Sequence, residues 1–191
     1  MSARTDPLGS WNAKRIVRNT FPLLIVLSII VLWAGITLEG AEDELRRFAI
    51  LAIIVPTMID MGGNLGAILS SRLTTRFHLG LTIDPRDHDL WANIGAIGAL
   101  ALTIFTALAF GAYAIGHFVG IEVALTDLLQ ISLISGMSIA VVAVVFSFAA
   151  TYASYRLGID PDDTTIPIVT NVVDVIGMVI FIGVSGAVLG F

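Results

Sequence analysis

Apolar residues are gathered into long runs along the chain, separated by short polar connections. Several of these runs reach 18 residues or more with few charges, which is typical of helices that cross a bilayer. The pattern therefore predicts an all-α integral membrane protein with five transmembrane helices per chain. The predicted helices cover residues 21–38, 48–72, 91–119, 127–155 and 166 or 167 to 191.

The first twenty residues are polar and basic, so we divide the chain into an N-terminal segment, 1–20, and a five-helix transmembrane domain, 21–191. A basic stretch before an apolar run also describes a secretory signal peptide. The run 21–38 is longer than the usual apolar part of a signal peptide, and no Ala-x-Ala cleavage pattern follows it. We therefore interpret this run as the first membrane helix.

Two of the predicted helices contain polar positions that a lipid-facing helix does not tolerate. In the helix 48–72, Pro56 precedes the segment Asp60-Met61-Gly62-Gly63-Asn64, and in the last helix Thr170, Asn171 and Asp174 follow one another closely. Hydrocarbon offers no partners for polar side chains or for freed backbone groups, so such segments must face protein or a water-filled path. We interpret the two segments as the lining of one polar pathway.

The distribution of basic residues predicts the orientation of the chain. Eight of the ten Lys and Arg residues lie in the N-terminal segment or near the second and fourth connections, and the other two lie in the first connection. The positive-inside rule then places the N-terminus in the cytoplasm and the C-terminus outside.

This orientation places the two polar segments at a similar depth. Asn64 precedes Arg72 by eight residues, which corresponds to roughly 12 Å from the cytoplasmic end of its helix. Asp174 follows Pro167 by seven residues, which corresponds to about 10 Å from the same surface. The shared depth favours one common site.

Composition narrows the chemistry of that site. Hydrophobic residues make up 57% of the chain and charged residues 13%, and the formal net charge is −5, so we expect a lipid bilayer as surroundings and no nucleic acid partner. Cysteine is absent, which excludes disulfides and thiolate metal sites. None of the three histidines, His78, His88 and His117, lies deep in a predicted crossing. The donors at this depth are therefore hard oxygens, which favour Mg²⁺, Ca²⁺ or Mn²⁺ over zinc or copper.

A single pathway carboxylate is little charge for a divalent ion. Two copies of the chain across a two-fold axis would double it, so we expect a homodimer. The structural alternative is that Asp174 or Asp60 is a buried group satisfied by neighbouring donors. The acids of the connections have a solvated surface as their default role, with attraction of metal ions at the inner mouth as the alternative.

Small residues elsewhere predict close helix packing. Four glycines of the helix 91–119 suit close helix contact, and three serines of the helix 127–155 lie on one face, where interhelical hydrogen bonding is the favoured role. These residues are Gly95, Gly98, Gly111 and Gly116, and Ser132, Ser135 and Ser138.

Taken together, the polar segments resemble the membrane domain of the MgtE-type magnesium transporters, including their eukaryotic solute-carrier relatives. The similarity extends from the first helix onward. The matching motifs are Pro56 with Gly62-Gly63-Asn64-Leu65 and Ala67-Ile68, Ser71-Arg72-Leu73 with Thr75, and Asp160-Pro161-Asp162-Asp163 with Ile166-Pro167, Thr170, Asp174 and Gly177.

The resemblance implies that the helices 48–72 and 166–191 line an ion pore at a dimer interface, and that Asp174 binds hydrated Mg²⁺ there. Bacterial members carry cytoplasmic Mg²⁺-sensing domains ahead of the membrane part. Only about twenty residues precede the first helix here, so gating by such domains is not carried over. The resemblance assigns no role to Asp60.

The sequence thus predicts a homodimer that transports Mg²⁺ or a related divalent cation across a prokaryotic cell membrane, without enzymatic activity or a cofactor. Asp174 would hold the hydrated ion, Thr170 and Asn171 would flank it, and Asn64 with a helix break at Gly62-Gly63 would form the facing wall. A Na⁺-coupled divalent-cation exchanger is the alternative within transport. An intramembrane metal-dependent enzyme and a passive assembly subunit are the alternatives from other classes.

Overall fold

A computed structural model describes residues 13–81, 86–157, 159 and 161–191, and these residues form helices and no strand. Five helices are long and apolar enough to cross a membrane, as the sequence predicts. The helices in chain order are α1 (Ala13–Glu39), α2 (Glu42–Arg47), α3 (Ala49–His78), α4 (His88–Val119), α5 (Leu125–Arg156) and α6 (Pro161–Leu189).

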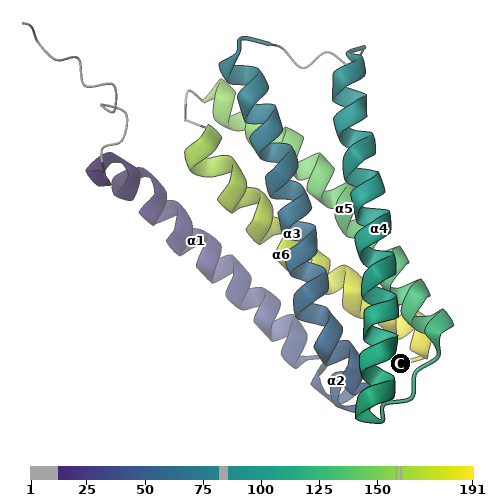
Figure 1. The fold of residues 1–191 in the computed structure, drawn as a ribbon. Coiled ribbons are helices and arrows are strands. Elements are labelled where there is room, and N and C mark those ends of the chain that lie inside the picture. Colours follow the sequence, from purple (N-terminus) through teal and green to yellow (C-terminus); the bar gives the residue numbers. More distant parts are fainter. Residues whose placement is uncertain (1–12, 82–85, 158, 160) are drawn as a thin grey trace, which may run out of the picture.

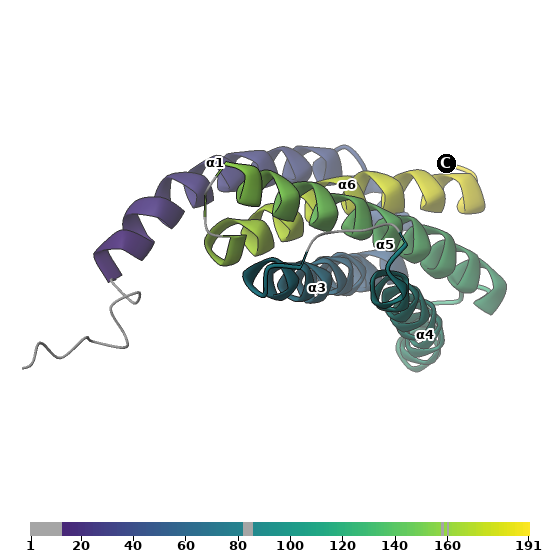
Figure 2. The same cartoon turned by 90° about the horizontal axis from the view of Figure 1, so that it is seen from above.

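The long helices are grouped around a three-helix centre. α3, α5 and α6 all pack against one another, α4 packs on α5 and α3, and α1 packs on α6 (Figure 1). Viewed from above, α1 and α4 lie at opposite edges of the bundle (Figure 2). Buried residues concentrate on α3 and α5, whereas α1 exposes most of its apolar surface, with Leu32 70% and Trp33 67% exposed. Apolar exposure of this extent suits lipid contact.

Two glycines allow α3 to approach its neighbours closely. A methyl group on Gly62 would lie 2.3 Å from Cγ2 of Ile139 on α5, and one on Gly66 would lie 2.6 Å from Cγ1 of Val169 on α6. The Ser147 hydroxyl on α5 also donates a hydrogen bond to the Gly66 carbonyl at 3.0 Å. Small residues at helix contacts are a usual feature of packing in membranes.

The helix α3 is continuous through Pro56 and the Gly62-Gly63 pair, so the predicted break at these glycines is wrong. A glycine weakens an isolated helix by about 1 kcal/mol relative to alanine. Here both glycines are buried, and Gly62 lies against side chains of α5 and α6. Packing against these helices stabilises the helical backbone at the pair.

Several predicted boundaries and contacts also differ from the structure. The first connection contains the additional short helix α2, in which Arg46 pairs with Glu42 at 2.5 Å, one turn away. A methyl group on Gly95, Gly98 or Gly111 of α4 would have no neighbour within 4 Å among the described residues, so the prediction of close contact is wrong for these three. Gly116 does meet another helix, because a methyl group there would lie 3.6 Å from Cδ1 of Ile50 on α3, and it would also lie 2.9 Å from the Ile121 carbonyl oxygen of the following connection.

The serine face of α5 is buried in part, but among the described residues it forms no hydrogen bond to another helix. Ser132 and Ser135 are fully buried, and their hydroxyls have no hydrogen-bond partner among the described residues. Ser138 donates to the Ile134 carbonyl of its own helix at 2.7 Å. The predicted interhelical bonding by these serines is therefore wrong, and α5 bonds to other helices through Ser147 and through the Ser154–Thr164 hydroxyl pair instead.

Candidate functional site

The polar segments of α3 and α6 meet at a cavity of about 480 Å³. Its polar lining comes from Asp60 and Asn64 on α3 and from Thr170 and Asp174 on α6, and α1 contributes apolar residues. The remaining lining residues are Val31, Ala34, Gly35, Leu38, Val55, Pro56, Ile59, Gly63 and Met178. The structure therefore brings together two segments about 110 residues apart in the sequence, at the common depth that helix geometry predicts.

Thr170 and Asp174 lie one turn apart on α6 and so share a face of the helix. The Thr170 hydroxyl donates within its own helix, to the carbonyls of Ile166 at 3.0 Å and Pro167 at 3.2 Å, which fixes the side chain and leaves its oxygen as an acceptor. Asp174 is half-buried, and no side-chain hydrogen bond to its carboxylate occurs among the described residues. A carboxylate at this depth without a protein donor is suited to binding a cation.

On α3, the Asn64 side chain donates from Nδ2 to Oδ2 of Asp60 at 3.1 Å, across one helical turn. A carboxylate only accepts hydrogen bonds, so the amide nitrogen must face it and the amide oxygen of Asn64 remains available. Asp60 and Asn64 are exposed on the isolated protomer although they lie near the middle of a membrane-spanning helix. Exposed polar groups at this depth must be covered by protein or by water.

Gly63 lies directly opposite the Asp174 carboxylate. A methyl group on Gly63 would lie 3.4 Å from Oδ1 of Asp174 and 3.7 Å from Cβ of Thr170. The absence of a side chain here keeps the space in front of the carboxylate open. Gly62, in contrast, is buried against Ile139 and Val173 and does not line the cavity.

Asn171, predicted as an oxygen donor, does not line the cavity either. Its Nδ2 atom donates to the Pro167 carbonyl at 2.7 Å. Since it follows Thr170 by one position, it points about 100° away around the helix, given 3.6 residues per turn. The bond ties the side chain to the backbone of α6, so that Asn171 supports the wall rather than facing the space.

Asp60 lies in the polar segment that the sequence assigns to the pathway, but it was not among the residues expected to contact the ion. Its i, i+4 spacing to Asn64 was a usable signal, because residues at this spacing share a helix face and Asn64 was already assigned to the site. With Asp60 included, two carboxylates of one chain line the cavity, and no basic side chain lines it among the described residues. Each protomer therefore supplies two carboxylates to the cavity, whereas only one per chain was expected.

The donor set consists of two carboxylates, one amide oxygen and one hydroxyl oxygen. All are hard oxygen ligands, which suit Mg²⁺ and related divalent ions, and Mg²⁺ commonly keeps several waters when it binds to one or two carboxylates. Among the residues that the structure describes, no group of three or more His, Cys, Asp or Glu is arranged to hold a metal. The arrangement therefore suits a hydrated ion better than a fully dehydrated one.

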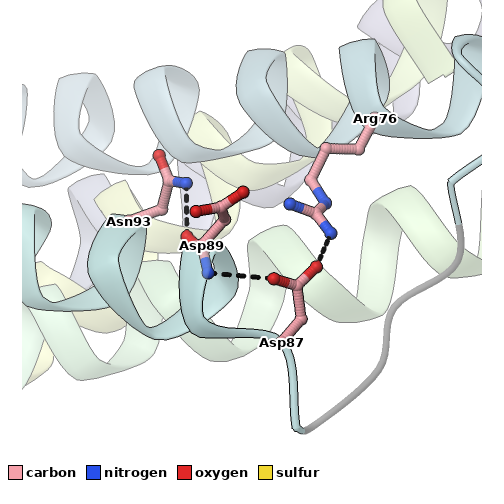
Figure 3. A network of polar contacts seen from close by, with 4 residues as sticks. All are labelled: Arg76, Asp87, Asp89 and Asn93. Atoms are coloured by element: carbon pink, nitrogen blue, oxygen red, sulfur yellow. Dashed lines mark hydrogen bonds and ion pairs between the residues drawn. The ribbon is translucent and has the colours of Figure 1, made fainter.

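A second polar cluster joins the end of α3 to the start of α4 (Figure 3). Arg76 forms an ion pair with Asp87, which also caps α4 by accepting a hydrogen bond from the Asp89 backbone at 2.9 Å. Arg72 donates to Oδ1 of Asn93 at 2.7 Å, and Asn93 donates to the Asp89 carbonyl at the same distance. The hydrogen bond from Arg76 holds the pKa of the Asp87 carboxyl below its ordinary value.

This cluster makes Asp87 a structural residue, not a freely solvated one. The predicted role of four other acids lies outside the described residues. These are Asp84 and Asp160 and the side chains of Asp162 and Asp163.

A known protein family matches the part of the chain that contains both polar segments. The sequence model of a family described as "MgtE: Divalent cation transporter" matches residues 55–184. The match begins one residue before Pro56 and ends beyond Met178, so it includes the polar residues of both cavity walls.

Proposed function

The chain belongs to the MgtE family of divalent cation transporters, and from this premise we propose that it carries Mg²⁺ or a related divalent cation across the membrane, through a pathway lined by α3 and α6 of a homodimer. The observation that carries the proposal is the cavity in which Asp174 and Thr170 of α6 face Asn64 and Gly63 of α3. Oxygen donors gathered at mid-membrane depth are the chemistry that a hydrated divalent cation requires.

In this proposal Asp174 attracts and holds the hydrated ion, because its carboxylate is half-buried and faces the open space at Gly63. Thr170 and Asn64 accept hydrogen bonds from the waters of the ion. Asn171 and Gly62 act indirectly, the first through its bond to the Pro167 carbonyl and the second by allowing α3 to pack closely on α5.

The homodimer is supported by the outer face of α3. Asp60 and Asn64 lie on this face together with Ile53 and Ile68, each of which is 43% exposed. A polar stripe within an apolar face is unfavourable against lipid, and contact with the same stripe of a second copy around a two-fold axis would cover it. The ion would then pass between the two copies.

We also propose that the N-terminus lies in the cytoplasm and the C-terminus outside, in the cell membrane of a prokaryote. The support for the orientation is the excess of basic residues in the N-terminal segment and near the second and fourth connections. In this orientation α3 runs inward and α6 runs outward.

The experiment that tests the proposal is uptake of Mg²⁺ into proteoliposomes that contain the purified protein or its Asp174→Asn variant. The substitution keeps the shape but removes a charge, whose attraction for the ion at about 4 Å is worth on the order of several kcal/mol. We expect flux through the variant to fall by at least about tenfold, with the folded protein retained. Full Mg²⁺ flux through a folded Asp174→Asn protein would refute the site.

The same uptake assay, run with and without a Na⁺ gradient, separates uncoupled transport from Na⁺-coupled exchange. Asp127→Asn provides a matched control, because it removes a carboxylate in the first turn of α5, away from the cavity. This control should leave flux unchanged.

A further inference from the structure

We infer that Asp60 is a second cation-binding carboxylate of the pathway and that it sets the preference of the site for divalent over monovalent cations. The inference rests on the proposed function, because it concerns the same ion path. It assigns a specific role to a residue that the sequence places in the polar segment of the helix 48–72 and to which the family resemblance gives no role.

The position of Asp60 is the first part of the argument. It lines the same cavity as Asp174 but approaches from α3, so the two carboxylates enter the space from facing walls. The Asn64 amide holds one carboxylate oxygen, Oδ2, at 3.1 Å. The other oxygen, Oδ1, has no side-chain partner among the described residues, so it is available to an ion or to the waters of an ion.

The space between the walls is the second, independent observation. Gly63 lies on α3 between Asp60 and Asn64, and it has no side chain to fill the gap in front of Asp174. A cavity of about 480 Å³ remains there even though α1 packs on α6 alongside it. A pair of carboxylates required only for structure would be expected to meet basic side chains that compensate their charge, and no Lys, Arg or His lines this cavity within the described part of the chain.

The balance between the charges of the carboxylates and of the ion explains a preference for divalent over monovalent cations. Within the cavity of each protomer the two carboxylates carry two negative charges, which one divalent cation neutralises and one monovalent cation leaves half-compensated. An uncompensated charge in a low-dielectric environment is costly, so the divalent ion is favoured. With Asp60 neutral, a single negative charge per protomer would remain, and this advantage of a divalent ion would be reduced.

The competing interpretation is that Asp60 serves only as a local hydrogen-bond partner of Asn64 on the surface of α3. In that case an amide at position 60 could still bond to Asn64, and cation binding would not change. The two interpretations therefore differ in the behaviour of a charge-removing variant that keeps the shape of the side chain.

The test compares Asp60→Asn, Asp60→Glu and the Asp127→Asn control, each as the purified full chain. Mg²⁺ affinity is measured by calorimetry, and uptake of Mg²⁺ and of Na⁺ is measured in proteoliposomes. For Asp60→Asn we expect Mg²⁺ affinity to fall by about tenfold or more, together with a lower ratio of Mg²⁺ to Na⁺ uptake. Asp60→Glu should retain most of the affinity and the control all of it.

Unchanged Mg²⁺ affinity and an unchanged uptake ratio in Asp60→Asn would overturn the inference. If Asp60→Asn does not yield folded protein, Asp60→Glu and Asp60→Ser replace it, since the inference requires the charged variant to bind Mg²⁺ more tightly than the neutral one. Asp174→Asn, measured in parallel, separates the two proposals. Loss of flux in Asp174→Asn with normal behaviour of Asp60→Asn refutes the role of Asp60 alone, whereas normal flux in both variants refutes the proposed site as well.

Discussion

The Gly63 backbone and the Asp174 carboxylate face each other across the cavity, with 3.4 Å between Oδ1 and the position that a methyl group on Gly63 would take. This spacing is an ordinary van der Waals contact, so Gly63→Ala should fold. The added methyl would occupy space through which the hydrated ion reaches the carboxylate. We expect Mg²⁺ flux to fall with little loss of stability, measured as uptake rate and unfolding temperature on one preparation.

The neighbouring glycine provides the contrasting variant. A methyl group on Gly62 would lie 2.3 Å from Cγ2 of Ile139, and a β-branched side chain in a helix cannot easily rotate away. Overpacking of this kind typically costs about 1–3 kcal/mol. Gly62→Ala should therefore lower the unfolding temperature, while any protein that folds keeps an open cavity. A larger loss of stability in Gly63→Ala than in Gly62→Ala would contradict this assignment.

The proposed orientation predicts which connections face the cytoplasm. The chain has no cysteine, so single cysteines report accessibility without background. Leu81→Cys, at an exposed position after α3, should be labelled by a membrane-impermeant reagent only after the cells are opened. Glu122→Cys, at an exposed position between α4 and α5, should be labelled on intact cells. The reverse pattern would overturn the orientation.

The proposed homodimer predicts cross-linking along the outer face of α3. Thr57 is exposed one turn before Asp60, so cysteines at this position in two copies should be joined by a short cross-linker in native membranes. Leu102→Cys on α4, where the native residue is 53% exposed, serves as a lipid-facing control and should give little dimer. A purified protein that remains monomeric and still transports would rule out a pathway between two copies.

The ion pair between Arg76 and Asp87 predicts a dependence of stability on pH. The pKa of Asp87 is lower in the folded protein than its ordinary value of about 3.9. The carboxylate therefore stabilises the fold above the ordinary pKa, and this contribution is lost as the pH falls through the folded pKa. Asp87→Asn should be less stable than the native protein at neutral pH, and this difference should shrink below about pH 4.

The N-cap provides the control for this measurement. Asparagine caps a helix about as well as aspartate, whereas alanine does not. Asp87→Ala should thus be less stable than Asp87→Asn at every pH. Parallel pH profiles of unfolding temperature for the native protein and Asp87→Asn would show that the ion pair contributes nothing.

The long apolar runs made the five membrane helices predictable, because length and hydrophobicity alone define a membrane span. The meeting of the two polar segments was predictable for a similar reason, since the rise per residue fixes the depth of Asn64 and Asp174. Such arguments locate a residue along the axis of a helix. They do not give its rotation, which depends on the neighbouring helices.

The wrong predictions about individual site residues follow from not knowing how each helix is rotated about its axis. Gly62 and Gly63 are adjacent in the sequence, yet one packs against Ile139 and the other faces Asp174. Asn171 was grouped with Thr170, although it faces away from the cavity. Asp60 was left out of the expected ion ligands because its position beside Asp174 in the cavity depends on the packing of α3 on α6. The helix break was predicted from glycine propensity, which tertiary packing outweighs at this position.

The close packing of Gly62 and Gly66 limits how the molecule can move. Sliding α3 by one residue along α5 or α6 would place larger side chains at contacts that already have no space for a methyl group. Packed interfaces of this kind move as units and do not deform continuously. Any transport cycle should thus leave α3, α5 and α6 as one rigid body. The helix that remains free to move would be α1, which lines the cavity and packs chiefly on α6.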